Sequence, residues 1–308
     1  MKKILLIILS VIIFSPKVFA ESENIALLTQ KGFFDKIKTT SQNPYEEIRD
    51  TFYLHTKFSN EYKFEQLKDL YAPNYYNADG FNRENYFDLI KKTWENYPGI
   101  KYKMEIIDIK ISGNYATVYL EESARADTAS AGGILRDKGY LQSNSDTIYF
   151  LEKIANEWKI TSDNIIFEKT YLTYGSASYC SFNLNAPSKI PMNTEYTATL
   201  NIKSPPDTIV LASIGREKVT YPQIQAEEVF RRLPESGILE RMFISNNENL
   251  NEFAVASFGV AKLDLSRGSD IKINITGMGF AMSRVNVISA KLENNKNDKK
   301  KDSENDKK

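Results

Sequence analysis

The sequence predicts two consecutive architectures, an α+β domain followed by an all-β sandwich. Before residue 99, apolar residues recur at helical spacing, whereas from residue 102 they alternate with polar residues, as in half-buried strands. After residue 176 the alternation continues and helical spacing almost disappears. Helices that precede an antiparallel sheet pack on it as a second layer, and strands with one apolar face each need a second sheet to bury that face.

Three helical segments are expected in the first part. The first begins at Pro44, because proline at the first helical turn lacks only an N–H group that would have no partner there. The second ends before Pro73, and the third ends before Pro98 and Gly99. The expected apolar faces consist of Ile48, Phe52 and His55, of Phe64, Leu67, Leu70 and Tyr71, and of Tyr86, Leu89, Ile90 and Trp94.

The strands that follow are joined by short turns. Ser-Gly-Asn at residues 112–114 predicts one hairpin, and Ala-Asn-Glu at residues 155–157 predicts another. The first strand changes face at Ile106 and Ile107, which predicts a bulge or a strong bend. The expected strands are residues 102–111, 115–120, 147–154, 158–160 and 164–172.

Three motifs occur in this region in a fixed order. They are FEQLKDLYAPNYYNADG (residues 64–80), NRENYFDLIKKTWENYPGIKYKMEIIDIKISGNYATVYLE (residues 82–121) and YFLEKIANEWKI (residues 149–160). In their order and spacing, residues 44–174 resemble the nuclear transport factor 2-like superfamily, which includes ketosteroid isomerases and SnoaL-like proteins. The resemblance implies a cone-shaped domain with helices on a curved antiparallel sheet, and pairing of two copies through the open sheet. This superfold hosts many activities, so the motifs indicate a fold more than a function.

The same resemblance implies a candidate catalytic pair. In ketosteroid isomerase-like members a cavity carboxylate follows the Tyr of the LYA motif by eight residues, which corresponds to Asp79. An oxyanion-binding Tyr precedes that Tyr by sixteen residues, where this sequence departs from the family and has His55. A carboxylate facing a neutral hydrogen-bond donor can move a proton beside a carbonyl group. The expected cavity lining is Phe52, Tyr71, Tyr75, Tyr86 and Trp94.

Structural roles for both residues of this pair are also open. Asp79 and Gly80 form a turn dipeptide, in which an Asp side chain often bonds its own backbone. A single His on an apolar helix face is commonly a core residue with a satisfied hydrogen bond. On this alternative, Asp79 lies at the mouth of the cavity and the cavity binds a ligand without reacting with it.

The second half predicts an immunoglobulin-like β-sandwich. About seven short strands with one apolar face each are typical of that fold, although the Cys and Trp pattern of antibody domains is absent. The expected strands are residues 179–184, 196–202, 208–214, 241–245, 253–262, 271–275 and 279–290.

An insertion at residues 215–240 interrupts the strand pattern. Long connections between strands often carry function, and a mixture of arginine and aromatic residues is typical of interface centres. The alternative is a structural loop whose Phe and Leu side chains close the end of the sandwich. The candidate partner-binding residues are Arg216, Tyr221, Phe230, Arg231 and Arg232.

Composition excludes several classes of function. The 308 residues include 40 Lys and Arg and 40 Asp and Glu, so the chain lacks the basic excess of a general nucleic-acid binder. The single His excludes a His-based zinc site, and neither a phosphate-binding loop nor a dinucleotide-binding fingerprint is present. We therefore expect no metal, no cofactor and no nucleic-acid partner. Cys180 is the single cysteine, and we expect a small buried apolar residue there.

The N-terminus predicts export. Lys2 and Lys3 precede an apolar run, and Val18, Phe19 and Ala20 fit a signal-peptidase site. We therefore expect a soluble protein in the periplasm or outside the cell. The expected segments are a signal peptide (1–20), a lead-in (21–43), the α+β domain (44–175), the sandwich (176–292) and a disordered charged tail (293–308).

Together these patterns favour an exported, non-catalytic binding protein. The cavity or the sandwich loops would engage a small apolar ligand or a protein partner in the cell envelope. One alternative is a small cavity enzyme that uses Asp79 and His55 for proton transfer or dehydration. Another is a structural module that forms a homodimer through the open sheet.

Overall fold

A computed structural model describes the chain from residue 43 to residue 289, apart from short gaps. The described residues are 43–131, 135, 137–224, 228–264 and 272–289. The expected signal peptide, nearly all of the lead-in segment and the charged tail lie outside these residues. Within the described chain, no helix is both long and apolar enough to cross a membrane.

Each helical segment expected from the sequence is present. The Asn43 side chain accepts the backbone N–H of Tyr45 at 3.0 Å, and that of Asn82 accepts the N–H of Asn85 at 2.9 Å. These asparagines supply acceptors for N–H groups that a helix start leaves unpaired. The helices are α2 (Pro44–Asn60), α3 (Phe64–Asp69) and α4 (Arg83–Asn96).

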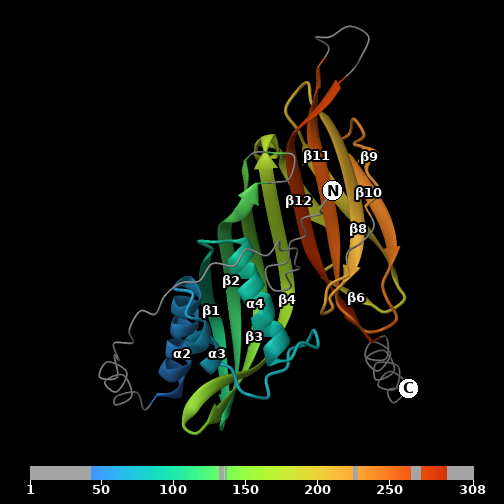
Figure 1. The fold of residues 1–308 in the computed structure, drawn as a ribbon. Helices are drawn as coiled ribbons and strands as arrows, with labels where there is room; N and C mark the ends of the chain where they lie inside the picture. The colour runs from blue at the N-terminus through green and yellow to red at the C-terminus, as the bar shows by residue number, and fades with distance from the viewer. Residues whose placement is uncertain (1–42, 132–134, 136, 225–227, 265–271, 290–308) are drawn as a thin grey trace, which may run out of the picture.

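The strands form one large sheet and one small sheet (Figure 1). The large sheet has nine strands, in the order β1-β2-β3-β4-β12-β11-β8-β9, with β6 paired beside β12. Its members are β1 (Lys101–Ser112), β2 (Tyr115–Ala131), β3 (Lys138–Ile154), β4 (Glu157–Gly175), β6 (Lys189–Pro191), β8 (Ile209–Lys218), β9 (Arg231–Arg232), β11 (Glu252–Asp264) and β12 (Lys272–Ile288). The small sheet has the order β10-β7-β5 and consists of β5 (Ser181–Asn185), β7 (Glu195–Lys203) and β10 (Ile238–Ile244).

The structure confirms the bulge expected in the first strand. The register of β1 on β2 shifts between Ile106 and Asp108. The same kind of shift occurs twice between β3 and β4, where no bulge was predicted. A bulge interrupts the alternation of apolar and polar residues, because it adds one residue to one strand only. For this reason the predicted strands 158–160 and 164–172 are one continuous strand, β4.

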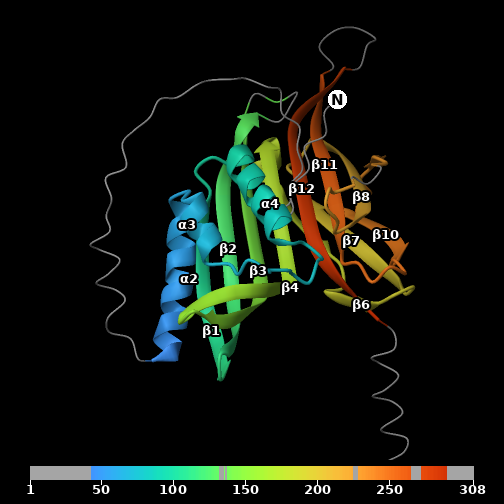
Figure 2. The ribbon, with the colours of Figure 1, turned by 60° about the horizontal axis from the view of Figure 1, so that its bottom comes forward.

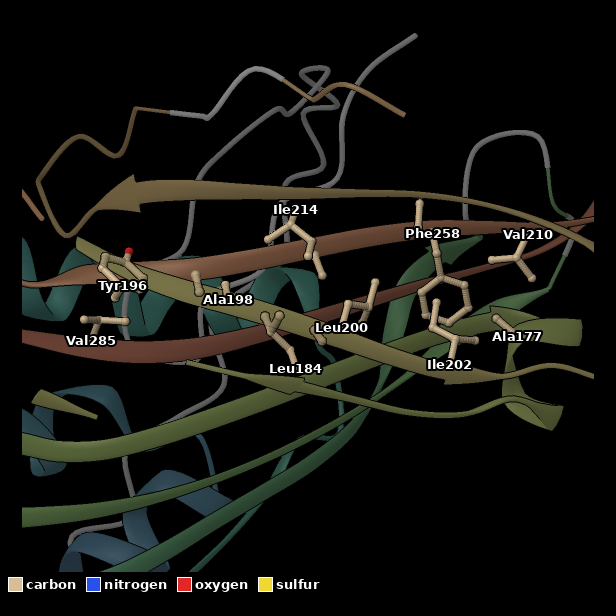
Figure 3. Packing of buried hydrophobic residues seen from close by; sticks show 14 of the residues in the cluster. Ala177, Leu184, Tyr196, Ala198, Leu200, Ile202, Val210, Ile214, Phe258 and Val285 are labelled. Atoms are coloured by element: carbon tan, nitrogen blue, oxygen red, sulfur yellow. The ribbon is translucent and has the colours of Figure 1, made fainter. Parts of the chain in front are cut away.

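The small sheet packs on one face of the large sheet. Figure 3 shows Leu200 and Ile202 of β7 beside Phe258 of β11, in a core that also contains Val285 of β12. Successive residues of a strand point to opposite faces, so Met282 of β12 belongs to a different cluster, which includes Leu89 of α4. The second half is therefore a two-layer arrangement of sheets. An immunoglobulin-like fold for it stays a prediction.

The helices cover the opposite face of the large sheet at its other end. In Figures 1 and 2, α2, α3 and α4 lie against the sheet formed by β1 to β4. The core between them contains Ile48 and Phe52 from α2, Phe87 from α4, and Val118 and Leu120 from β2. Helices on one face of an antiparallel sheet are the α+β arrangement that the sequence predicts for residues 44–175.

The large sheet continues across the boundary expected at residues 175 and 176. β4 pairs with β12 from Gly175 opposite Gly277 to Lys169 opposite Ser283. The boundary therefore lies at the end of a strand inside a continuous sheet, and not in a linker. One apolar cluster also spans it, with Phe81 and Leu89 packed on Val219, Phe253 and Met282. Two separate folding units stay a prediction, and the two halves share both a sheet and a core.

Candidate functional site

Asp79 lies in the turn that follows α3, as the turn dipeptide indicated. The turn is held by Asn77, whose side-chain oxygen accepts the N–H groups of Asp79 at 3.1 Å and Phe81 at 2.9 Å. Gly80 has a φ of +85°, a left-handed conformation that favours glycine. The Asp79 carboxylate is thereby free of its own turn and points into the protein.

The Asp79 carboxylate forms a buried ion pair with Arg284 of β12, and their side chains are 6% and 1% exposed. Asn251 also donates to the Asp79 Oδ1 atom at 2.8 Å. This pair joins the helical half to the second half of the chain. The prediction of Asp79 as a cavity acid, or as a residue at the cavity mouth, is therefore wrong, because its charge is already matched by a guanidinium at the junction.

His55 lies in α2 and belongs to a chain of ring hydrogen bonds. Its Nε2 atom is 2.8 Å from the Tyr71 hydroxyl, which is 3.2 Å from the hydroxyl of Tyr86. Its buried Nδ1 atom has no hydrogen-bond partner within the described chain. Burial lowers the pKa of His55 to about 4, so the imidazole is neutral near pH 7. His55 and Asp79 consequently do not form the expected pair.

A small cavity of about 60 Å³ lies between the helices and the sheet. Of the aromatic residues expected to line it, Tyr86 and Trp94 do so, whereas Phe52, Tyr71 and Tyr75 are buried in the core beside it. The lining residues are His55, Ser59, Leu67, Tyr86, Ile90, Trp94, Tyr102, Lys103, Met104, Glu122, Ser123, Ala124, Ser143, Ser145 and Tyr149.

Glu122 of β2 is the acidic residue of this cavity, and it is not among the residues predicted from the sequence. Its Oε1 atom accepts a hydrogen bond from Tyr149 at 2.8 Å, and its Oε2 atom accepts from Thr147 at 3.1 Å and Ser145 at 3.3 Å. Burial raises the pKa of Glu122, and the three hydroxyl donors act in the opposite direction. Glu122 could have been found from the alternation of inward-facing and outward-facing residues in β2. That alternation puts residue 122 on the same face as the buried Leu120.

Two further buried carboxyl groups lie on β4. Tyr75 donates its hydroxyl hydrogen to Asp163, and burial raises the pKa of Asp163 to about 7. Neither carboxyl oxygen of Glu168 has a hydrogen-bond partner within the described chain. Burial raises the pKa of Glu168 to about 7, although the nearby Arg284 favours its charged form.

Glu122 and Glu168 lie at one level of the sheet. Glu122 is opposite Ser145 of β3, and Ser145 is opposite Glu168 of β4. The pairing of β4 with β12 brings Arg284 close to Glu168, whose pKa it lowers. A row of polar side chains therefore crosses the buried face of four strands, from the cavity to the Asp79 ion pair.

The five candidate residues in the insertion at residues 215–240 do not form a single exposed surface. Arg216 donates to the carbonyl oxygen of Ile244 and lies 3.4 Å from Glu252, so it holds β8 to the small sheet. Tyr221 donates to Asp88 of α4 and accepts from Lys92 at 3.1 Å. The polar groups of both residues are thus engaged within the chain, and their contact with a partner stays a prediction.

The remaining residues of the predicted partner surface are exposed. Arg231 and Arg232 form the short edge strand β9, and Phe230 beside them is 47% exposed. Leu233 packs against the core between the two sheets, as the alternative structural role predicted. Within the described chain, no group of three or more acidic, His or Cys side chains is arranged to hold a metal ion.

Comparison with known proteins gives no assignment from sequence, since no protein family and no curated protein matches the chain. Among solved structures, a conserved protein from Planctomyces limnophilus is 13% identical, with a TM-score of 0.34 over 39% of this chain and 91% of that chain. A hexachlorocyclohexane dehydrochlorinase of type 2 is 11% identical, with a TM-score of 0.34 over 43% of this chain and 87% of its own. A nuclear transport factor 2-like superfamily protein from Salmonella enterica serovar Typhimurium is 14% identical, with a TM-score of 0.31 over 39% and 87%. These likenesses concern only part of the chain and only its fold.

Proposed function

We propose that the chain is an exported, non-catalytic binding protein whose helical half holds a small ligand in the cavity beside Glu122. The supporting observation is the carboxylate itself. It lies in the wall of an aromatic cavity, three hydroxyl groups hold it in place, and Glu122 as a whole residue is only partly buried. A ligand pocket typically combines apolar walls with a few placed polar groups, and this cavity has that composition.

The cavity favours binding, the expected function, over the alternative of proton transfer by Asp79 and His55. The neutral His55 side chain is hydrogen-bonded to Tyr71, and Asp79 is paired with Arg284. Both groups of the predicted pair thus have structural partners. Glu122 is the remaining candidate base of the cavity, since burial raises its pKa. If the protein were instead a proton-transfer enzyme, Glu122 would be the group that accepts the proton.

Export and a protein partner complete the proposal. The N-terminal segment has the features of a signal peptide, and an immunoglobulin-like sandwich would present Phe230, Arg231 and Arg232 to a partner in the envelope. Dimerisation through the open sheet is a further candidate role. Tyr119 and Phe150 on its outer face are 36% and 39% exposed, which is the kind of surface that a second copy would cover.

A filled-cavity variant tests the proposal. Ala124 is a buried lining residue of β2, and Ala124→Leu adds three carbon atoms to the wall of the small cavity. Its control is Arg125→Leu, which makes a change at the next, outward-facing position of the same strand. We expect fragment-sized compounds to give saturation-transfer NMR signals with the wild-type protein and the Arg125→Leu control, and not with Ala124→Leu. If no compound distinguishes Ala124→Leu from its control, the cavity is not the binding site.

A further inference from the structure

The buried face of the helical half has more acidic groups than basic ones. Glu122, Asp163 and Glu168 all lie there, and Arg284 is the buried guanidinium beside them. That guanidinium already forms an ion pair with Asp79. No Lys or Arg side chain of the described residues forms an ion pair with Glu122, Asp163 or Glu168.

The other lining groups of the cavity do not supply a positive charge. His55 is neutral near pH 7 because burial lowers its pKa to about 4. Lys103 reaches the cavity edge, but its side chain is 75% exposed and its ammonium group pairs with Glu105 at 3.2 Å. A charged carboxylate in a desolvated site is costly unless an opposite charge lies close to it.

The walls around Glu122 suit a positive charge. Tyr86, Trp94, Tyr102 and Tyr149 line the cavity together with the Met104 thioether. The faces of aromatic rings attract cations electrostatically, and recognition of organic ammonium groups commonly uses several such rings. A neutral apolar ligand would use the rings but would leave the carboxylate without a counter-charge.

Glu122 also has an unused acceptor position. A carboxylate offers about four lone-pair positions, two on each oxygen. On Glu122, Oε2 accepts from Ser145 and Thr147, whereas Oε1 accepts from Tyr149 alone. The Oε1 atom can therefore accept one more hydrogen bond from a ligand N–H group.

We propose that the ligand of this cavity is a small organic ammonium ion that donates an N–H hydrogen bond to Glu122 Oε1. This inference rests on the proposed binding function and names the chemical class of its ligand. The cavity volume of about 60 Å³ limits the buried part of the ligand to a compact group. By comparison with the volume of a buried water, that is roughly five heavy atoms.

Two probes of the same shape test the proposal. The tert-butylammonium ion carries an N–H donor and a positive charge, and tert-butanol has a neutral hydroxyl in its place. We expect isothermal titration calorimetry on the mature wild-type chain at pH 8 to show at least tenfold tighter binding of the ammonium ion. This comparison needs no variant, so it does not depend on the folding of one.

Variants then test the role of the carboxylate. In Glu122→Gln the shape is kept and the charge is removed, so the preference for the ammonium ion should disappear. The matched control is Glu121→Gln at the adjacent, outward-facing position of β2, which should keep the wild-type preference. Persistence of a tenfold preference in Glu122→Gln would overturn the assignment of the charge to Glu122.

The outcomes separate the ligand class from the binding function. If both probes bind the wild-type protein equally, the inference of a cationic ligand is wrong and the cavity remains a binding site. The same conclusion holds if fragments from the filled-cavity experiment bind while neither probe does. If no compound binds in either experiment, the proposed function fails together with the inference.

Discussion

Removal of the Asp79 charge should destabilise the whole protein, although the residue lies in a turn. In Asp79→Asn the turn is kept, since Asn77 makes the hydrogen bonds of that turn and asparagine is itself a common turn residue. What is lost is the negative charge beside Arg284, whose side chain is 1% exposed. Breaking a buried ion pair by removing one partner costs about 3–5 kcal/mol, because the other charge stays buried without compensation.

The neighbours of Arg284 set the size of the effect. Its Nε group donates to Asn286 at 2.9 Å, its guanidinium lies 5.8 Å from the ring centre of Phe253, and Glu168 is close enough to favour its charge. Glu168 can ionise when Asp79 is neutralised, so we expect the lower end of the range, about 3 kcal/mol. For a chain of this size that is a decrease in Tm of roughly 6–12 °C.

Thermal and urea unfolding of Asp79→Asn, Arg284→Met and the double variant measure the pair directly. The two single variants should each be less stable, and the double variant should be more stable than the sum of the two losses predicts. Asp127→Asn, an exposed carboxylate on β2, is the control and should stay within about 0.5 kcal/mol of the wild type. An Asp79→Asn variant as stable as this control would refute the buried ion pair and leave Asp79 a simple turn residue.

Two other substitutions have effects that follow from the structure. The pKa of Glu168 is raised to about 7 in the folded protein, so its contribution to stability is present below the unfolded-state pKa of about 4.3 and is lost as the pH rises through 7. Glu168→Gln should therefore match the wild type at pH 4 and be more stable at pH 8, by up to about 4 kcal/mol in urea unfolding; equal pH profiles would contradict this. Gly175 has a φ of +52°, and a Cβ atom there would lie 2.4 Å from the carbonyl oxygen of Thr276. Gly175→Ala and Gly113→Ala both place a side chain at a left-handed position, so both should lower the free energy of unfolding. Because Gly113 has open space around it, the loss should be larger at Gly175 by about 1–3 kcal/mol, and equal losses for both would contradict the close approach of β12.

The helices and the first hairpin could be predicted because their signals are local. Apolar spacing on α2 and α4, the proline at the start of α2, and the change of face at Ile106 all depend on residues a few positions apart. Each of these features is present in the structure. Local sequence patterns are sufficient to predict helices and hairpins, because the contacts that form these elements join residues that are close in sequence.

The links between the two halves could not be predicted from such patterns. Asp79 meets Arg284 across 205 positions of sequence, and β4 pairs with a strand that begins almost 100 residues after it ends. The dipeptide of Asp79 and Gly80 correctly indicated a turn, but neither it nor the spacing from the LYA motif carried information about which way the carboxylate points. The contacts of Arg216 and Tyr221 within the chain could not be predicted for the same reason, since Glu252 and Asp88, which bind them, are distant in sequence.

The chain contains its own reference for a structural buried carboxylate, and the cavity residue differs from it. Glu252 is 0% exposed and accepts hydrogen bonds from the backbone N–H of Asn246 at 2.8 Å, the Asn246 amide at 2.6 Å and the Tyr196 hydroxyl at 3.2 Å. Its charge is matched by Arg216 at 3.4 Å. Glu252 therefore has both donors and a counter-charge, as Asp79 also has. Glu122 has hydroxyl donors, no cationic partner among the described residues, and a partly accessible surface in an aromatic cavity. A buried carboxylate without a counter-charge destabilises the fold, so we infer that a bound ligand supplies the positive charge beside Glu122.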